Sequence, residues 1–426
     1  MTEHADLRFP SGFLWGAATS AYQVEGNCSK NDWWAWEEIE GFIQDGSRSG
    51  IACDHYNRFD EDFALAQQLG HNAARISIEW SRIEPEEGRW DMAEVDHYRR
   101  VLESMHRHGL TPLVTLHHFT NPLWIANKGG WIEPSIVDHV SRYAAFISGQ
   151  LGELVPKWDT INEPMVLVNG MHIYLRGDWQ KTTAVARHML KAHAAMYQAI
   201  HAATSHNPQV SIVHAMPYMM PENPDSEADR EASRLRDQLA VEYILAGIES
   251  GTIGPPFGEG EDVPGLKGAW DAIGINYYTR NIAAAGDSPA ALRGRVPESV
   301  ETTLAGDEVY PEGLYHGIMR LAKYGRPIYV TENGISTLDD GQRNRYLLRH
   351  LQQAHRAISD GADLRCYMYW SLLDNFEWMM GYSQKFGMCA LEPGTLNRLP
   401  KPAAYIYRDI ATSNRISAAQ LKAHLG

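Results

Sequence analysis

The sequence has few cysteines and no long apolar run, and each absence argues against a class of protein. Four cysteines, Cys28, Cys53, Cys366 and Cys389, are scattered along 426 residues without a C-x-x-C pair. A disulfide framework or a zinc knuckle is therefore not expected, and buried free thiols are the simpler interpretation. No stretch approaches the ~18 consecutive apolar residues that a membrane-spanning helix needs, so a membrane protein is not expected either.

Positive charge is also scarce. The chain has 38 Lys and Arg against 53 Asp and Glu, which gives a formal net charge of −15. This charge repels nucleic acid and anionic membranes, and no basic run compensates for it locally, so neither is an expected partner. The first residues, Met-Thr-Glu-His-Ala-Asp, lack the basic start and apolar segment of a secretory signal, which predicts a cytoplasmic protein.

Apolar and β-branched residues form eight short β-type runs along the chain. Segments with a helical spacing of apolar residues separate most of these runs, as in Phe59–Gly70, Val95–Gly109 and Ala184–Ala203. Strand and helix alternating eight times predict an α/β protein that forms a single (β/α)8 TIM barrel over residues 1–426. The runs are Phe13–Ser20, Ala73–Trp80, Thr111–Phe119, Lys157–Glu163, Val210–Met216, Asp271–Tyr278, Pro327–Glu332 and Leu364–Leu372.

Three long connections show little regular patterning. They are Gly26–Cys53, Pro217–Glu227 and Asn281–Asp307, and they follow the first, fifth and sixth β-type runs. On a barrel, such connections become extended loops at the C-terminal face, where the walls of a substrate site usually lie.

The second β-type run alternates strictly between apolar and polar residues. Ile76 and Trp80 are expected to face the surrounding helices, which leaves Arg75, Ser77 and Glu79 pointing into the barrel. A charged arginine inside a barrel needs a partner, because an unpaired buried charge is too costly. An active-site carboxylate is the expected partner of Arg75.

Two glutamates end β-type runs in similar surroundings. Glu163 lies in the segment 158–164, just before a proline, and Glu332 lies in the segment 329–334, just before Asn-Gly. Either glutamate alone fits a solvent-facing turn. In one barrel, however, both would lie at the C-terminal face together with an inward arginine. Paired carboxylates in that position are what the hydrolysis of a glycosidic bond requires.

Motifs in a fixed order extend from residue 9 to residue 408. The first is Phe9-Pro10-x-x-Phe13-x-Trp15-Gly16-x-Ala18-Thr19-Ser20-x-Tyr22-Gln23-x-Glu25-Gly26. Later motifs are Arg75-x-Ser77-x-x-Trp80-x-Arg82, His117-His118-Phe119, Trp158-x-Thr160-x-Asn162-Glu163-Pro164, Asn276-Tyr277-Tyr278, Thr331-Glu332-Asn333-Gly334, Trp370-Ser371-Leu372-Leu373-Asp374-Asn375-Phe376-Glu377-Trp378 and Lys401-Pro402-x-Ala404-Tyr405-x-Tyr407-Arg408. Over nearly the whole chain, these motifs resemble those of family 1 of the glycoside hydrolases, which are retaining β-glycosidases.

The resemblance implies a role for each member of the glutamate pair. Glu163 corresponds to the general acid/base and Glu332 to the nucleophile. Two carboxyl groups as close as about 5–5.5 Å cannot both ionise comfortably. Arg75 and the hydroxyl of Tyr278 would stabilise the anion of Glu332, which leaves the proton on Glu163, while Asn276 would position Tyr278 and Glu332.

The resemblance also implies a set of sugar-binding residues, and neither a metal nor a cofactor is expected. Adjacent histidines on a strand seldom chelate one ion, so His117 and His118 are not expected to bind a metal. Residues expected to bind sugar hydroxyls are Gln23, His118, Asn162, Glu377 and Trp378, with Trp370 as the stacking surface. Residues expected near the leaving group, or aglycone, are Trp124, Met165 and His172.

Glu377 also indicates which sugar is bound. Family members that act on 6-phosphorylated sugars typically have Ser at this position, with Lys and Tyr seven and nine residues later. This chain has Glu377, Gln384 and Phe386 instead. A carboxylate would repel a phosphate, so an unphosphorylated hexose is expected.

The resulting prediction is a retaining exo-β-glycosidase, a β-glucosidase that acts on small-molecule β-glycosides. It would remove terminal non-reducing β-D-glucosyl residues, with galactosyl or fucosyl residues as further substrates. Two alternatives stay open: a transglycosidase with an alcohol acceptor, and a catalytically inactive barrel that binds a sugar or a partner. The sequence indicates neither the natural aglycone nor the oligomeric state.

Overall fold

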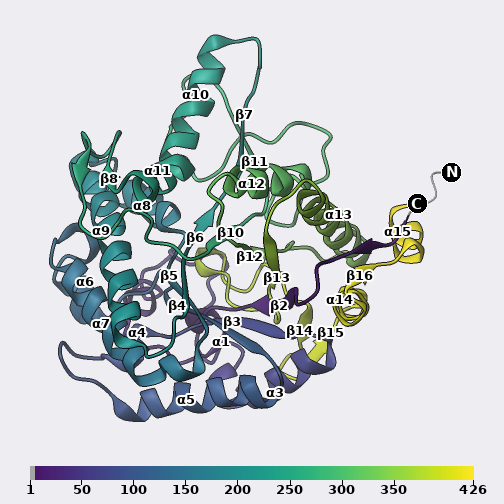
Figure 1. Cartoon of the computed structure of the whole chain (residues 1–426), viewed down its shortest axis with the longest axis horizontal. Coiled ribbons are helices and arrows are strands. Elements are labelled where there is room, and N and C mark those ends of the chain that lie inside the picture. The colour runs from purple at the N-terminus through teal and green to yellow at the C-terminus, as the bar shows by residue number, and fades with distance from the viewer. Residues whose placement is uncertain (1–4) are drawn as a thin grey trace.

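The computed structural model describes residues 5–426, and its centre is a closed barrel of eight parallel strands (Figure 1). The strands follow one another around the barrel in chain order, and the last pairs with the first. They are β2 (Leu14–Ala18), β3 (Ala73–Ser77), β4 (Thr111–His117), β5 (Lys157–Asn162), β6 (Gln209–Ala215), β10 (Ile273–Asn276), β12 (Ile328–Asn333) and β13 (Leu364–Trp370). This arrangement confirms the predicted (β/α)8 fold, and each predicted β-type run overlaps one of the eight strands.

Helices surround the barrel and cover its outer face. In α5 (Met92–Arg107), for example, the buried residues Val95, Tyr98, Val101, Leu102 and Met105 recur every three or four positions and form one apolar face. The other main helices are α3 (His55–Gln68), α7 (Ile136–Leu151), α8 (Pro164–Tyr174), α9 (Trp179–Ala203), α10 (Glu227–Asp237), α11 (Tyr243–Ser250), α12 (Glu312–Ala322), α13 (Asp340–Ser359), α14 (Pro402–Ser413) and α15 (Ala418–Leu425).

The second predicted run extends too far. Strand β3 ends at Ser77, and the short helix α4 begins at Trp80. Glu79 is the N-cap of α4, because its carboxylate accepts hydrogen bonds from the backbone N–H and the hydroxyl of Ser81. The prediction that Glu79 belongs to the strand and points into the barrel is therefore wrong.

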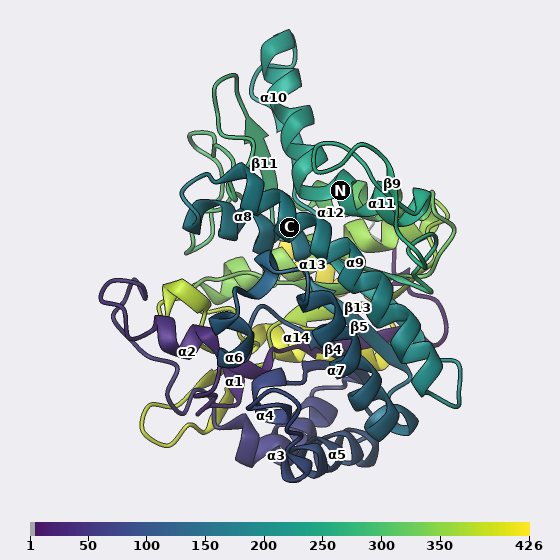
Figure 2. The same cartoon turned by 90° about the vertical axis from the view of Figure 1, so that its left-hand side faces the viewer.

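The long connections contain more regular structure than the sequence pattern indicates. Strand β7 (Tyr218–Pro221) lies in the second connection, and β11 (Arg280–Ala283) begins just before the third and extends into it. These two strands pair in parallel and form a small sheet of their own. The first connection contains α2 (Asp32–Trp36), whose Trp36 ring lies 6.0 Å from the ring of Tyr174 in α8. Figure 2 shows α2 below α8 on the left-hand side of the molecule.

Short elements complete the described chain. Within residues 5–426, no helix is long and apolar enough to span a membrane. The remaining elements are α1 (Ala21–Val24), α4 (Trp80–Ile83), α6 (Leu123–Asn127), η1 (Gly130–Ile132), η2 (Gly152–Leu154), η3 (Gln238–Glu242), η4 (Trp378–Met380), β1 (Leu7–Arg8), β8 (Thr252–Ile253), β9 (Glu261–Asp262), β14 (Cys389–Leu391), β15 (Arg398–Pro400) and β16 (Arg415–Ile416).

Candidate active site

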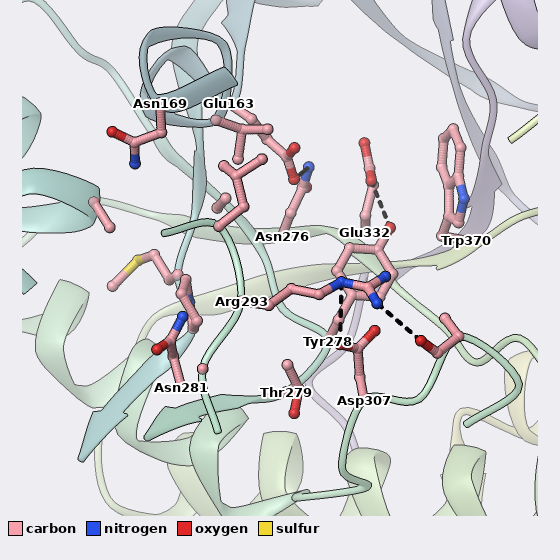
Figure 3. Close-up of a pocket in the computed structure, with 18 of the residues that line it drawn as sticks. Glu163, Asn169, Asn276, Tyr278, Thr279, Asn281, Arg293, Asp307, Glu332 and Trp370 are labelled. Atoms are coloured by element: carbon pink, nitrogen blue, oxygen red, sulfur yellow. Dashed lines mark hydrogen bonds and ion pairs between the residues drawn. The ribbon is translucent and has the colours of Figure 1, made fainter. Parts of the chain in front are cut away.

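A cavity of about 330 Å³ opens at the carboxyl ends of the barrel strands (Figure 3). Residues at or next to the ends of five strands line it: Asn162, Ala215, Asn276, Glu332 and Trp370. The backbone of a parallel barrel brings all strand ends to one face, so residues far apart in sequence meet there. Both glutamates of the predicted pair, Glu163 and Glu332, line this cavity.

Arg75 is fully buried beneath the cavity, where all three guanidinium nitrogens donate hydrogen bonds. Nη1 donates to Oε1 of Glu332 (2.6 Å), Nε to Oδ2 of Asp159 (3.0 Å) and Nη2 to Oδ1 of Asn162 (2.8 Å). The second carboxylate oxygen of Glu332 accepts a hydrogen bond from the Tyr278 hydroxyl (2.6 Å). A positive charge and a strong donor therefore both favour the ionised form of Glu332.

Glu163 lies in a different environment at the junction of β5 and α8. Its backbone is left-handed, with φ +47°, and the residue caps the N-terminus of α8, where Pro164 begins the helix. This conformation is uncommon for a residue with a side chain, and such conformations concentrate at functional sites. The Glu163 carboxyl accepts a hydrogen bond from the Asn276 side-chain amide (2.9 Å), and within residues 5–426 it forms no salt bridge.

The two environments separate the protonation states of the glutamates. Burial and the nearby charge of Glu332 raise the pKa of Glu163 to about 8. Burial also raises the pKa of Glu332, but Arg75 and the Tyr278 hydroxyl oppose that rise. The proton shared by the pair therefore favours Glu163, and the negative charge favours Glu332.

Aromatic rings form the inner wall of the cavity. The ring of His118 stacks near Trp370 (centroids 6.1 Å apart) and Trp378 (6.0 Å), and Trp378 stacks in turn on Tyr22 (5.7 Å). Burial and the charge of Arg75 lower the pKa of His118 well below its usual value, so its ring is neutral. Its Nδ1 is buried and has no hydrogen-bond partner among residues 5–426.

Glu377 lines the same inner wall. Burial and the charge of Glu332 raise the pKa of Glu377 to about 8, and hydrogen bonds from Trp370 and Gln23 oppose the rise. Gln23 is fully buried and is not among the residues that line the cavity. Its amide donates to Oε2 of Glu377 (3.2 Å) and to the backbone carbonyl of Phe376 (2.9 Å), so it holds Glu377 in place from behind.

Comparison with known proteins identifies this arrangement. The model of glycosyl hydrolase family 1 matches residues 5–416. The chain belongs to glycosyl hydrolase family 1. A 1,4-beta-D-glucan glucohydrolase of Thermotoga neapolitana is 32% identical, with 96% of this chain and 99% of the relative covered. A beta-galactosidase of Pyrococcus woesei is 30% identical, with 96% and 98% covered.

Solved structures of family 1 enzymes agree with this assignment. The beta-glycosidase from Pyrococcus horikoshii has a TM-score of 0.90 and 39% identity, with 98% of both chains covered. The family 1 β-glucosidase from Thermotoga maritima has a TM-score of 0.91 and 31% identity, with 97% of this chain and all of that chain covered. The resemblance seen in the sequence motifs is thereby confirmed.

The three residues expected near the leaving group of a family 1 enzyme do not lie together. Met165 lines the cavity, whereas Trp124 and His172 are not among its lining residues. The Trp124 indole N–H donates to the backbone carbonyl of Glu84 (2.9 Å), and Nδ1 of His172 pairs with the hydroxyl of Thr182 (2.8 Å). These contacts hold both side chains away from the lining of the cavity, and their role near the leaving group stays a prediction.

Asp159 is a site residue that was missed from the sequence. It accepts hydrogen bonds from Nε of Arg75 (3.0 Å) and from the hydroxyls of Thr115 (3.3 Å) and Ser211. Its position in the middle of the buried strand β5 could have indicated this role, because a buried carboxylate needs a cation just as the buried Arg75 needs an anion. Asp159 fixes the guanidinium that contacts Glu332.

Proposed function

We propose that this family 1 protein is a retaining exo-β-glycosidase that removes terminal non-reducing β-D-glucosyl residues from small β-glycosides. The observation that carries the proposal is that the carboxyl groups of Glu332 and Glu163 have different hydrogen-bond partners. Glu332 contacts Arg75 and the Tyr278 hydroxyl, whereas the side-chain partner of Glu163 in the described part of the chain is the neutral amide of Asn276. One ionised and one protonated carboxyl group are what a retaining mechanism needs.

In the first step, the Glu332 carboxylate attacks the anomeric carbon of the bound sugar and forms a glycosyl ester. The bond from that carbon to the leaving oxygen breaks, and Glu163 gives its proton to this oxygen. Once Glu332 is esterified, its negative charge is gone, so the pKa of Glu163 falls. Glu163 then removes a proton from water, which attacks the same carbon and releases Glu332.

We propose that the inner end of the cavity binds the sugar that is released. Glu377, His118 and Trp378 would bind its hydroxyl groups, and Trp370 would stack on its apolar face. The Asn162 carbonyl oxygen accepts hydrogen bonds from Arg75 and Asn276. One amide N–H pairs with Nε2 of His118 (3.3 Å), which leaves the other to donate to the 2-hydroxyl.

The proposed sugar is an unphosphorylated hexose. Glu377 stands at the position where phosphosugar enzymes have a serine, and in its ionised form it would repel a phosphate, while the neutral Gln384 offers no compensating charge. Relatives named β-glucosidase and beta-galactosidase support activity on both glucosides and galactosides. The cytoplasmic location expected from the sequence stays a prediction, which fractionation of the source cells would test.

The test replaces the proposed acid/base. In Glu163→Ala, an activated aryl β-glucoside should still form the glycosyl ester, because its leaving group needs no proton. Azide should then restore turnover and give a β-glycosyl azide, since the anion needs no general base. An α-azide product would show that the enzyme inverts. If azide has no effect on turnover, Glu163 is not the general acid/base. Wild-type protein with azide is the control and should release only the free sugar.

A further inference from the structure

Two asparagine side chains with little exposure line the outer part of the cavity (Figure 3). Asn169, on α8, is 5% exposed, and Asn281, on β11, is 3% exposed. In Figure 3 both lie on the side away from Trp370, with Glu163, Asn276 and Glu332 between them and that ring. They are therefore on the leaving-group side of the acid/base.

The amide groups of these residues are only partly satisfied by the protein. Oδ1 of Asn281 accepts a hydrogen bond from Nη1 of Arg236 (2.8 Å), but its Nδ2 has no acceptor within residues 5–426. The Asn169 amide has no hydrogen-bond partner in that range. Buried polar groups are nearly always paired, so amides that face a cavity without protein partners are expected to bind water or a ligand.

The surrounding wall is apolar and adaptable. Met165, Val166, Met216 and Met219 line the same cavity. Methionine side chains adjust their shape to what they contact. A sugar ring presents apolar C–H faces and a rim of hydroxyl groups, which matches a wall of methionines with two amides. An aryl or alkyl group would contact the methionines but would leave both amides unpaired.

The charged residues of this region are already paired. Arg280 forms an ion pair with Glu308 (2.7 Å). Arg293 pairs with Asp307 (3.6 Å) and donates to the backbone carbonyl of Ala305 (2.9 Å). No unpaired cation is thus left among the described lining residues of this region for an anionic leaving group, and an uncharged one fits better.

We propose that Asn169 and Asn281 form a subsite that binds the hydroxyl groups of a second sugar unit, so that the preferred substrate is a β-linked disaccharide or short oligosaccharide. This inference rests on the proposed glycosidase function. It identifies two residues that determine the leaving group and take no part in the chemical step.

The test compares two substrates with the same glucosyl unit. Cellobiose carries a sugar as its leaving group, and 4-nitrophenyl β-glucoside carries an aryl group. Asn169→Leu should lower the ratio of kcat/KM for cellobiose to kcat/KM for the aryl glucoside by about 10- to 100-fold, because only cellobiose loses hydrogen bonds. Asn281→Asp keeps the acceptor for Arg236, removes the free donor, and should lower the ratio in the same direction.

A matched control is available in the fold. Asn344, on α13, is also buried with an unpaired amide oxygen, but it does not line the cavity. Asn344→Leu should leave the substrate ratio within about threefold of wild type, since it changes no substrate contact. If Asn169→Leu lowers kcat/KM for both substrates equally, so that the ratio does not change, the proposed subsite is refuted.

Assays of the wild-type enzyme distinguish a failure of the sugar subsite from a failure of the glycosidase function. If it hydrolyses the aryl glucoside but not cellobiose, the sugar subsite is overturned and the glycosidase function stands. If it hydrolyses neither substrate, the proposed function fails as well. Should Asn169→Leu not fold, Asn281→Asp gives the same comparison without altering α8.

Discussion

Replacing Arg75 with methionine tests the physical basis of the active site. Methionine has a similar length and no charge, so the change leaves Glu332 and Asp159 buried without the cation that contacts both. Removing one partner of a buried ion pair costs about 3–5 kcal/mol, because the remaining charge is uncompensated. For a chain of 426 residues the unfolding entropy is about 0.9 kcal/mol/K, so the melting temperature should fall by about 3–6 °C at pH 7.

The same substitution should change the pH dependence of catalysis. Arg75 lowers the pKa of Glu332, so its loss allows burial to raise that pKa further. The nucleophile must be ionised, and the acid limb of the kcat/KM profile for an activated aryl glucoside should therefore move to higher pH. If that limb coincides with the wild-type limb, Arg75 does not keep Glu332 ionised, and the account is refuted.

The stability of Arg75→Met should also depend on pH, because the pKa of Glu332 changes. A carboxyl group whose folded pKa lies above its unfolded value stabilises the fold at low pH, and this contribution is lost as pH rises through the folded pKa. With Arg75 absent, the folded pKa of Glu332 is higher still. The deficit in melting temperature relative to wild type should thus be larger at pH 8 than at pH 5. A deficit independent of pH would contradict this reasoning.

Arg398→Met is the matched control for Arg75→Met. Arg398 is also buried and pairs with the fully buried Asp62, with Nη2 2.9 Å from Oδ2. This pair is not among the groups lining the cavity. The variant should lose a comparable amount of stability, but its kcat/KM profile should keep the wild-type acid limb.

Two further predictions concern the raised pKa values. In Glu332→Gln, turnover should be abolished and the pKa of Glu163 should fall below about 8, because the charge that raises it is gone; infrared titration of the carboxyl band would measure this, and an unchanged pKa would exclude the coupling. Glu377→Gln should lower kcat/KM for glucosides by about 10- to 100-fold above pH 8, where Glu377 is ionised and charged acceptors bind hydroxyls most strongly. A wild-type preference for 6-phospho-glucosides would show that Glu377 does not exclude phosphate.

The barrel could be predicted because its signals are local. Each strand is a short apolar run and each helix a periodic stripe, so their order along the chain is sufficient to indicate the fold. The small sheet of β7 and β11 was not predicted, since it depends on pairing between two separate connections. Glu79 was assigned to the wrong element because its capping contact with Ser81 overrides the alternating pattern.

Some features of the candidate site could likewise be predicted from the sequence, and others could not. The need of Arg75 for a carboxylate follows from burial alone, and strand-end positions place Glu163 and Glu332 on one face. That Gln23 lies behind Glu377, and that Trp124 and His172 point elsewhere, depends on side-chain packing that sequence spacing does not specify.

The sequence by itself determined the order of the strands, the two carboxyl groups and the buried arginine, because periodicity and turn residues act over short distances. The motif resemblance implied which carboxyl group contacts the arginine and which keeps the proton, but only the tertiary structure brings these groups together. The pKa values of the two carboxyl groups depend on the distances between Arg75, Glu163 and Glu332 and on the burial of each group. Local sequence patterns specify neither distance nor burial. The amides of Asn169 and Asn281 likewise face one cavity only because the fold brings α8 and β11 to the same mouth.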